Sequence, residues 1–262
     1  MPEWLSVIIL GIIEGITEFL PISSTGHLLL AEHWIPRQSD LFNIVIQTAA
    51  VMAVIPLFAP RFRALTEASR AGEARNYFIK VLAAFFITGV LGFILEKRGF
   101  KLPEEARPIG IALLIGGVLF LAIEAMIRGK RLGNEITWAI AGAVGIGQVI
   151  AAIFPGASRS GTTILIMLVM GLSRPAATEF SFLVSIPTMI AAGALKIFKA
   201  LHHPAPNAVP EHWGMVILGS AVAAVVSFIA VKWLLRFVQS HTFNGFGWYR
   251  IAAGLAVLLL MR

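Results

Sequence analysis

The chain has 262 residues, of which 58% are hydrophobic and only 13% are charged. Soluble globular domains carry about 25% charged residues, so this composition excludes an ordinary soluble protein and predicts an integral membrane protein. The net charge of +7 is carried mostly by loops, where it fits contact with anionic lipids and argues against nucleic-acid binding. The absence of cysteine excludes disulfides and thiolate metal sites.

Several apolar windows are long enough to cross a hydrocarbon core as helices, which takes about 20 residues. They cover residues 41–60, 77–95, 109–127, 180–198, 214–235 and 248–261. Three further apolar pieces, 4–20, 136–154 and 164–172, are short or interrupted by polar residues, proline and glycine. The first of them contains glutamates and lacks a basic start, so it is not expected to be a signal peptide. Arg174-Pro175 is expected to end a helix.

The sequence also repeats itself weakly, at a spacing of 134 residues (145 minus 11). The matched pairs are Gly11 and Gly145, Glu14 and Gln148, Pro21 and Pro155, and Ser24 and Ser158. We predict an all-α polytopic membrane protein that forms a single domain, 1–262, with internal repeats of about 1–130 and 131–262. Each half would hold a re-entrant helical hairpin and three transmembrane helices. An odd number of crossings inverts the second half, as in many transporters.

The first repeat carries two glutamates inside its apolar start. Glu14 and Glu18 are four residues apart and share one face of a helix. Two like charges this close destabilise each other unless a cation or a shared proton intervenes. The pair is therefore a candidate for a divalent-metal site or a general base. The alternative is that one carboxylate caps a helix or forms an ion pair within the bundle.

A polar run follows these glutamates. Pro21 must break the helix, and Ser23, Ser24 and Thr25 stand where the next helix begins. Such residues cap helix N-termini, which bind anions through free N–H groups. His27 lies three residues after Ser24, within reach as a partner for its hydroxyl. The alternative is a simple cap beside a packing histidine.

The second repeat has a similar run that includes an arginine. Pro155-Gly156 breaks the helix, and hydroxyls follow at Ser158, Ser160, Thr162 and Thr163. Arg159 offers a planar, permanently charged fork that suits phosphate oxygens. The alternative is that Arg159 neutralises a glutamate of the first run as a structural ion pair. Both roles can coexist.

The two runs, Glu14 to His27 and Pro155 to Thr163, closely resemble those of bacterial undecaprenyl-diphosphate phosphatases, the bacitracin-resistance family. The resemblance covers essentially the whole chain. It implies hydrolysis of undecaprenyl diphosphate to the monophosphate and inorganic phosphate, which recycles the lipid carrier for peptidoglycan synthesis and confers bacitracin resistance. It also implies a divalent cation, Mg²⁺ or Ca²⁺, and a site that opens to the outer face of the cytoplasmic membrane.

The resemblance also implies roles for individual residues. The catalytic set is Glu14, Glu18, Ser24, His27 and Arg159, and the two glutamates would hold the cation. The phosphate-binding set is Ser23, Thr25, Gly26, Ser158, Ser160, Gly161 and Thr163. Two mechanisms stay open. Either Ser24 attacks the terminal phosphorus while His27 handles the proton, or Glu18 activates a water molecule.

Other functions also fit part of this pattern. A secondary transporter or flippase of an anionic lipid would use inverted repeats and broken helices equally well. An intramembrane serine protease that uses Ser24 or Ser158 is a further alternative. The expected partners are a polyprenyl diphosphate and membrane lipids, without nucleic acid, and a homodimer is left open. Cytoplasmic loops carry an excess of Lys and Arg. Loops 61–76 and 128–134 are basic, whereas loop 200–212 has no Lys or Arg, which favours both termini outside. Loop 96–108 is also basic and opposes this orientation.

Overall fold

The computed structural model describes residues 1–67, 71–99, 106–202 and 211–261. Within these ranges the chain is helical, and its only β-type pairing is an isolated bridge between Gly133 and Leu172. Five described helices are long and apolar enough to cross a membrane. The predicted all-α polytopic membrane fold is therefore confirmed.

The helices follow the predicted order along the chain. The first half contains α1 (Glu3–Thr17), α2 (Ser24–Glu32), α3 (Asp40–Val54), the 3-10 helix η1 (Ile55–Phe58), α4 (Ala59–Arg63), α5 (Ala71–Lys97) and α6 (Ala106–Ile127). The second half contains α7 (Trp138–Ile153), α8 (Arg159–Val169), α9 (Arg174–His202), α10 (Trp213–Phe237) and α11 (Asn244–Leu260). One expectation was wrong: Arg174-Pro175 begins α9, because proline is tolerated in the first turn of a helix.

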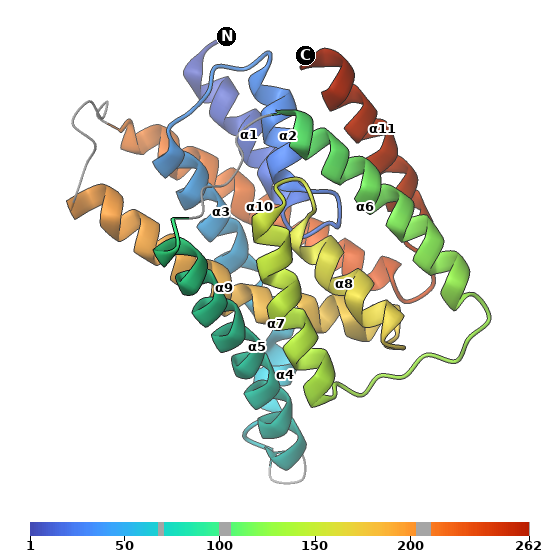
Figure 1. Cartoon of the computed structure of the whole chain (residues 1–262). Helices are drawn as coiled ribbons and strands as arrows, with labels where there is room; N and C mark the ends of the chain where they lie inside the picture. Colours follow the sequence, from blue (N-terminus) through green and yellow to red (C-terminus); the bar gives the residue numbers. More distant parts are fainter. Residues whose placement is uncertain (68–70, 100–105, 203–210, 262) are drawn as a thin grey trace.

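Helices α1 and α2 contact each other as one hairpin and α7 and α8 as another, and the packing of the bundle brings the two hairpins together (Figure 1). Helix α1 packs on α10, α7 packs on α5, and α6 lies along α11. Helix α9 contacts both α3 and α8. Both chain termini lie at the same end of the bundle, and the loops α1–α2 and α7–α8 meet in its interior (Figure 1). We call these loops tip 1 (residues 18–23) and tip 2 (residues 154–158).

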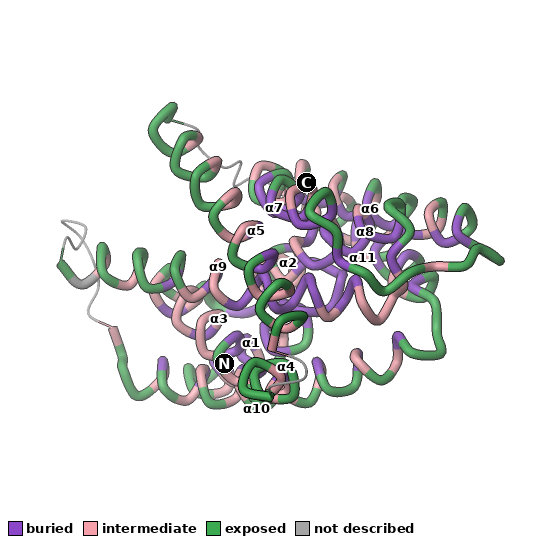
Figure 2. The backbone as a smooth tube through the Cα atoms, turned by 90° about the horizontal axis from the view of Figure 1, so that it is seen from below, coloured by how far each residue is buried: buried purple, intermediate pink, exposed green. Residues whose placement is uncertain are grey.

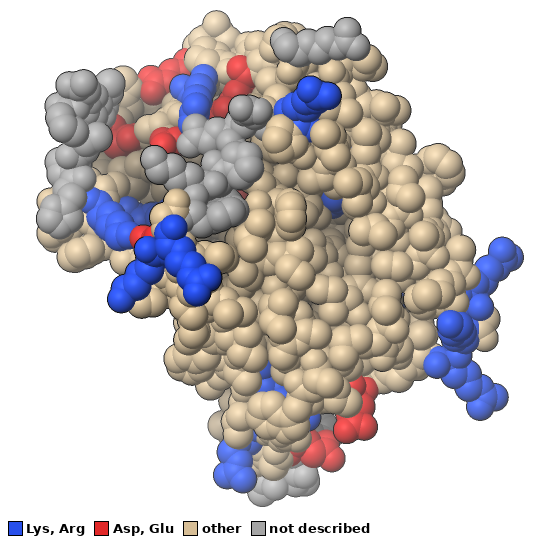
Figure 3. Space-filling model, viewed as in Figure 1, with Lys and Arg blue, Asp and Glu red and all other residues tan. Residues whose placement is uncertain are grey.

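The burial pattern is that of a bundle surrounded by lipid. Buried residues gather around the tips, whereas the outer faces of α5 and α10 are exposed (Figure 2). The exposed residues there include Phe86 and Phe93 of α5 and Ile217 and Val225 of α10. On the visible face, charged side chains lie toward the edges and the surface between them is largely uncharged (Figure 3). Such an apolar exterior suits a hydrocarbon solvent.

Small residues set the position of α1. A Cβ atom at Gly11 or Gly15 would lie 2.7 Å from a backbone carbonyl oxygen of α10. Only glycine allows this close approach, a common device for packing helices in membranes. The same helix carries Glu14 and has Glu18 as its C-cap residue, so the contact with α10 fixes where the two carboxylates enter the bundle.

The inverted repeat stays a prediction. The paired contacts, α1 with α10 and α7 with α5, are those that a duplicated chain would make. Parts of the loops that were compared for orientation, residues 68–70, 100–105 and 203–210, lie outside the described residues. The orientation of the termini therefore also stays a prediction.

Candidate active site

Both tips end in a serine with an unusual backbone. Ser23 has φ 74° and Ser158 has φ 67°, and among the described residues these are the non-glycine residues with positive φ. Each is the N-cap of the helix that follows: Ser23 Oγ accepts from the Gly26 N–H at 3.4 Å, and Ser158 Oγ from the Gly161 N–H at 3.2 Å. Strained residues of this kind cluster at functional sites.

The caps correct the register of the repeat. The sequence pairs Ser24 with Ser158, but the cap geometry makes Ser23 the counterpart of Ser158. Tip 2 has one more residue between its proline and its capping serine than tip 1. Ser24 and Arg159 therefore hold equivalent positions, because each is the first residue of its helix.

Both of these first residues bind the same carboxylate. The Ser24 hydroxyl donates a 2.5 Å hydrogen bond to Glu18 Oε2. Gln47 Nε2, from α3, donates to that oxygen at 3.1 Å, and Arg159 Nη2 donates to Glu18 Oε1 at 3.1 Å. The side chains of Glu18 and Arg159 are only 6% and 17% exposed. The Ser24 hydroxyl and the Arg159 guanidinium thus meet at the Glu18 carboxylate, where the N-termini of α2 and α8 come together.

Glu14 lies beside this cluster but differs from Glu18 in its hydrogen bonding. It is buried, and neither of its carboxylate oxygens has a hydrogen-bond partner among the described residues. Its polar neighbours are Glu18, Gln47 and Arg159. A buried carboxylate without partners is costly, so this group needs a proton or a cation. The observation fits the predicted metal pair.

His27 does not pair with Ser24. Its Nδ1 lies 2.7 Å from the Ser23 carbonyl oxygen and its Nε2 lies 2.7 Å from the Tyr249 hydroxyl on α11. A carbonyl oxygen only accepts, so Nδ1 carries the proton, and a neutral ring then accepts from Tyr249 at Nε2. The proton partner of Ser24 in this arrangement is Glu18, and the predicted pairing of His27 with Ser24 is not made.

The predicted phosphate-binding residues divide into two groups. Thr25 is exposed beside Ser24, whereas the hydroxyl of Thr163 is buried and bonds Ser181 of α9 at 2.7 Å. Ser160 is also buried and donates to the Leu20 carbonyl at 3.2 Å, which joins the two tips. Ser160 and Thr163 therefore serve packing in this arrangement, and the N–H groups of Gly26 and Gly161 are taken by the caps.

Comparison with known proteins identifies the family of this chain. A family model described as "Bacitracin resistance protein BacA" matches residues 7–256. The chain belongs to the BacA family. It is 46% identical over 257 residues to a protein of Rhizobium etli strain CIAT 652, covering 98% of this chain and 96% of the relative. It is 44% identical over 259 residues to a protein of Xylella fastidiosa strain 9a5c, covering 98% of each. Both relatives are named undecaprenyl-diphosphatase.

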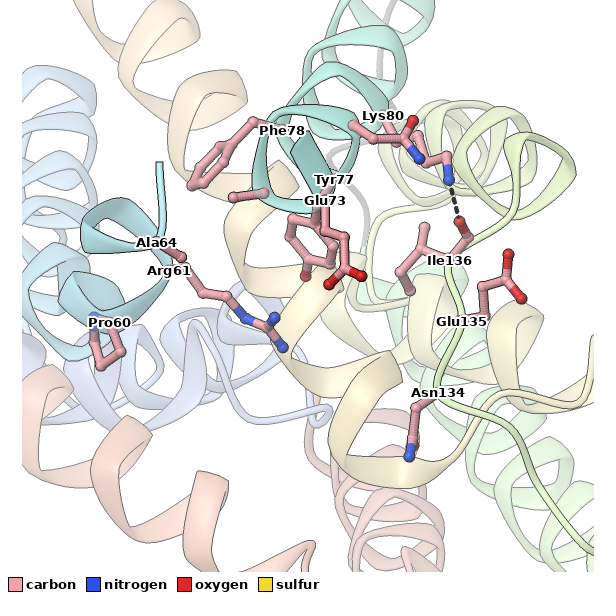
Figure 4. A pocket seen from close by; sticks show the side chains of 12 residues that line it. Pro60, Arg61, Ala64, Glu73, Tyr77, Phe78, Lys80, Asn134, Glu135 and Ile136 are labelled. Carbon is pink, nitrogen blue, oxygen red and sulfur yellow. Dashed lines mark hydrogen bonds between the residues drawn. The ribbon is translucent and has the colours of Figure 1, made fainter. Parts of the chain in front are cut away.

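This BacA-family chain has one hollow beside the site and a larger cavity elsewhere. The hollow, of about 300 Å³, lies beside His27 and Tyr249 and is otherwise mainly apolar, lined by Ile13, Ile16, Thr17, Ile22, Leu30, Ala31 and Trp34. The larger cavity of about 650 Å³ is lined by α4, α5 and the segment before α7 (Figure 4). There Lys80 is buried and donates to the Ile136 carbonyl at 2.7 Å (Figure 4). None of the predicted site residues lines the larger cavity.

Three residues at the site were missed by sequence reasoning. Gln47 binds Glu18, Tyr249 binds His27, and Arg250 donates to carbonyl groups of both tips. All three lie in windows that were interpreted only as membrane spans. Gln47 and Arg250 are polar residues in otherwise apolar runs, and such residues are functional candidates by default.

Replacing Arg159 with lysine is expected to lower kcat/KM roughly tenfold to a few hundredfold in a phosphate-release assay. An ammonium group cannot reproduce the fork, whose two end nitrogens bond Glu18 and the Ser185 carbonyl, and the lost bonding is about 1.5–3 kcal/mol. Arg61→Lys is the matched control, because Arg61 bonds Glu179 through a similar fork away from the tips. Near-wild-type turnover in the Arg159 variant would make this arginine structural.

Proposed function

We propose that this chain hydrolyses undecaprenyl diphosphate to undecaprenyl phosphate and inorganic phosphate. The observation that carries the proposal is the 2.5 Å hydrogen bond from Ser24 to Glu18, made at a helix N-terminus beside Arg159 inside an apolar bundle. Membership of a family whose relatives are named undecaprenyl-diphosphatase supports the choice of substrate. The activity would recycle a lipid carrier for peptidoglycan synthesis and lower sensitivity to bacitracin.

The first chemical step follows from the hydrogen bonds. The Ser24 oxygen attacks the terminal phosphorus, and Glu18 takes the proton that this oxygen loses. The bond from that phosphorus to the bridging oxygen breaks, and undecaprenyl phosphate leaves with the electron pair. Arg159 and the positive ends of α2 and α8 stabilise the charge that develops on the phosphoryl oxygens. Glu18 passes its proton to the leaving phosphate and then takes a proton from the water that attacks the phosphoserine. The bond from phosphorus to Ser24 Oγ breaks, inorganic phosphate leaves, and Oγ regains a proton from Glu18.

The hollow beside His27 would receive the lipid. Its walls are mainly apolar, and His27 and Tyr249 stand at its polar end. We place the first isoprene units of the polyprenyl chain there, so that the diphosphate reaches the tips from the lipid side. The enzyme would lie in the inner membrane with this site open to the outer face. Labelling of single cysteines introduced near the termini tests the orientation, since the chain has none of its own.

The residues present fit a divalent cation. Glu14 and Glu18 would hold it, because the Glu14 carboxylate lacks any hydrogen-bond partner among the described residues. No group of three or more His, Cys, Asp or Glu side chains forms a closed metal site in the described ranges. The remaining ligands would be phosphate oxygens and water, the usual arrangement for Mg²⁺. When bound, the ion would supply charge neutralisation at the phosphate.

Replacing Glu14 with glutamine is expected to raise the cation concentration needed for half-maximal activity by about tenfold or more. The amide keeps the size of the side chain but removes one of two charged ligands. Phosphate release is measured against Mg²⁺ and Ca²⁺ concentration. Glu3→Gln is the control, since it makes the same change on α1 at the exposed Glu3–His212 pair. An unchanged cation requirement in Glu14→Gln would remove Glu14 from the metal site.

The activity itself is tested with purified protein in detergent. Several polyprenyl diphosphates are supplied with and without chelator, and released phosphate is counted. Turnover that depends on added cation supports the proposal. A transporter or flippase would bind the lipid without releasing phosphate, so binding without turnover would contradict it.

A further inference from the structure

Arg250 is a wholly buried arginine of α11 that joins both tips. Its Nη1 donates to the Pro21 carbonyl of tip 1 at 3.1 Å. Its Nη2 donates to the Gly156 and Ala157 carbonyls of tip 2, each at 3.1 Å, and to the Ala112 carbonyl of α6 at 3.3 Å. One guanidinium therefore connects the two broken hairpins to the α6–α11 pair.

The surroundings of Arg250 accommodate its guanidinium closely. Among the described residues, no carboxylate pairs with Arg250, and its Nε has no partner. Gly116 on α6 leaves the space that the guanidinium fills, because a Cβ atom at that position would overlap it. A permanent charge buried without a counterion is destabilising, so its retention at this depth points to a function.

The carbonyl groups that Arg250 binds lie close to the reacting groups in the chain. Pro21 is three residues before Ser24, and Ala157 is two residues before Arg159. Two other contacts link the tips directly. The Ser160 hydroxyl bonds the Leu20 carbonyl, and Arg159 bonds Glu18, a pair that would change partners when a phosphate binds. A link that stays constant during turnover has to come from groups that do not react.

We propose that Arg250 is a positioning residue that holds tip 1 and tip 2 in register, so that Ser24 and Arg159 act on the same phosphorus atom. The expected effect on kcat rests on the proposed function. The fork of the guanidinium is essential to it, because several carbonyl groups of separate segments are bound at once. A lysine has the charge but not the fork.

The kinetic test compares Arg250→Lys with the wild-type enzyme. Loss of register should lower kcat by roughly 100-fold, since a displacement of about 1 Å has that effect, while KM stays within about threefold. Adding methylguanidinium to Arg250→Ala should restore part of kcat, and methylammonium should not. Arg174→Lys is the matched control, because the Arg174 fork binds Glu124 away from the tips. Its kcat should stay close to wild type.

A distance measurement tests the positioning directly. Spin labels are placed at Ile12→Cys, on α1 six residues before tip 1, and at Phe154→Cys, the first residue of tip 2. Both positions are exposed, and the chain has no cysteine of its own. Arg250→Lys should broaden the distance distribution, and Arg174→Lys should leave it narrow. If Arg250→Lys does not fold, Gly116→Ala displaces the guanidinium instead, with Gly110→Ala as the control within the same α6–α11 contact.

Wild-type kcat in Arg250→Lys, or an unchanged distance distribution, would overturn the proposal. A fall in kcat without broadening would also overturn it, because Arg250 would then act on the substrate through its charge. If the wild-type protein releases no phosphate, the proposed function fails, while the distance measurement still decides whether Arg250 sets the register of the tips.

Discussion

Replacing Ser24 with alanine is expected to lower kcat by roughly 10²–10⁴-fold. General-base catalysis usually contributes a factor of this size, and it is lost when the nucleophile is removed. The reason is the 2.5 Å hydrogen bond that ties the hydroxyl to Glu18. Phosphate release from undecaprenyl diphosphate measures the effect. Incubation with substrate labelled in the terminal phosphate should also trap label on the wild-type protein and none on the variant.

Ser23→Ala is the control for this experiment. It removes the neighbouring hydroxyl, which caps α2, and leaves Ser24 in place. The free energy of unfolding is expected to fall by about 1 kcal/mol, the usual effect of a lost helix cap. If Ser24→Ala keeps more than about a tenth of the wild-type rate, a deficit below about 1.4 kcal/mol, covalent catalysis through Ser24 is wrong. Water activated by Glu18 would then be the better mechanism.

Replacing Glu18 with glutamine is expected to remove activity to a similar extent, roughly 10²–10⁴-fold, because the amide cannot accept the proton. The carboxylate also receives hydrogen bonds from Gln47 and Arg159, which an amide fits poorly. Unlike Glu14→Gln, this variant should stay inactive at every cation concentration. The double variant Ser24→Ala/Glu18→Gln should be no slower than the slower single variant, since the two groups act as a unit.

Glu124→Gln separates this effect from a general loss of buried ion pairs. Glu124 is buried, pairs with Arg174 and accepts a 2.8 Å hydrogen bond from the Phe243 N–H, all away from the tips. Its replacement should lower thermal stability and leave kcat near the wild-type value. Activity in Glu18→Gln above about a tenth of wild type would contradict the role of Glu18 as base.

The parts of the site that local sequence determines were predictable. Proline positions predicted both helix breaks, and the hydroxyl runs after them predicted side-chain caps without specifying that Ser23 and Ser158 would be the capping residues. The ion pair between Arg159 and Glu18 matches the alternative interpretation of Arg159, whereas its phosphate-binding role stays a prediction. These features depend on neighbours in the chain or on the cost of burying a lone charge.

The parts that depend on helix packing were not predictable. The spacing of three residues suggested His27 as the partner of Ser24, but the ring faces α11 and bonds Tyr249. Gln47 and Arg250 reach the tips only because α3 and α11 pack against them. Nothing in a single apolar window shows which neighbouring helix it will contact, so these roles emerge only in three dimensions.

The charges at the tips have a thermodynamic consequence. With both carboxyl groups ionised, Glu14 and Glu18 carry two negative charges and Arg159 and Arg250 two positive ones, so the formal sum is zero. A diphosphate adds negative charge to this neutral, poorly solvated site, and the proposed divalent cation adds positive charge. Each ligand then raises the affinity for the other by the same factor, because coupling between two bound ligands is reciprocal. Titration of the cation with and without a non-hydrolysable diphosphate would measure that factor.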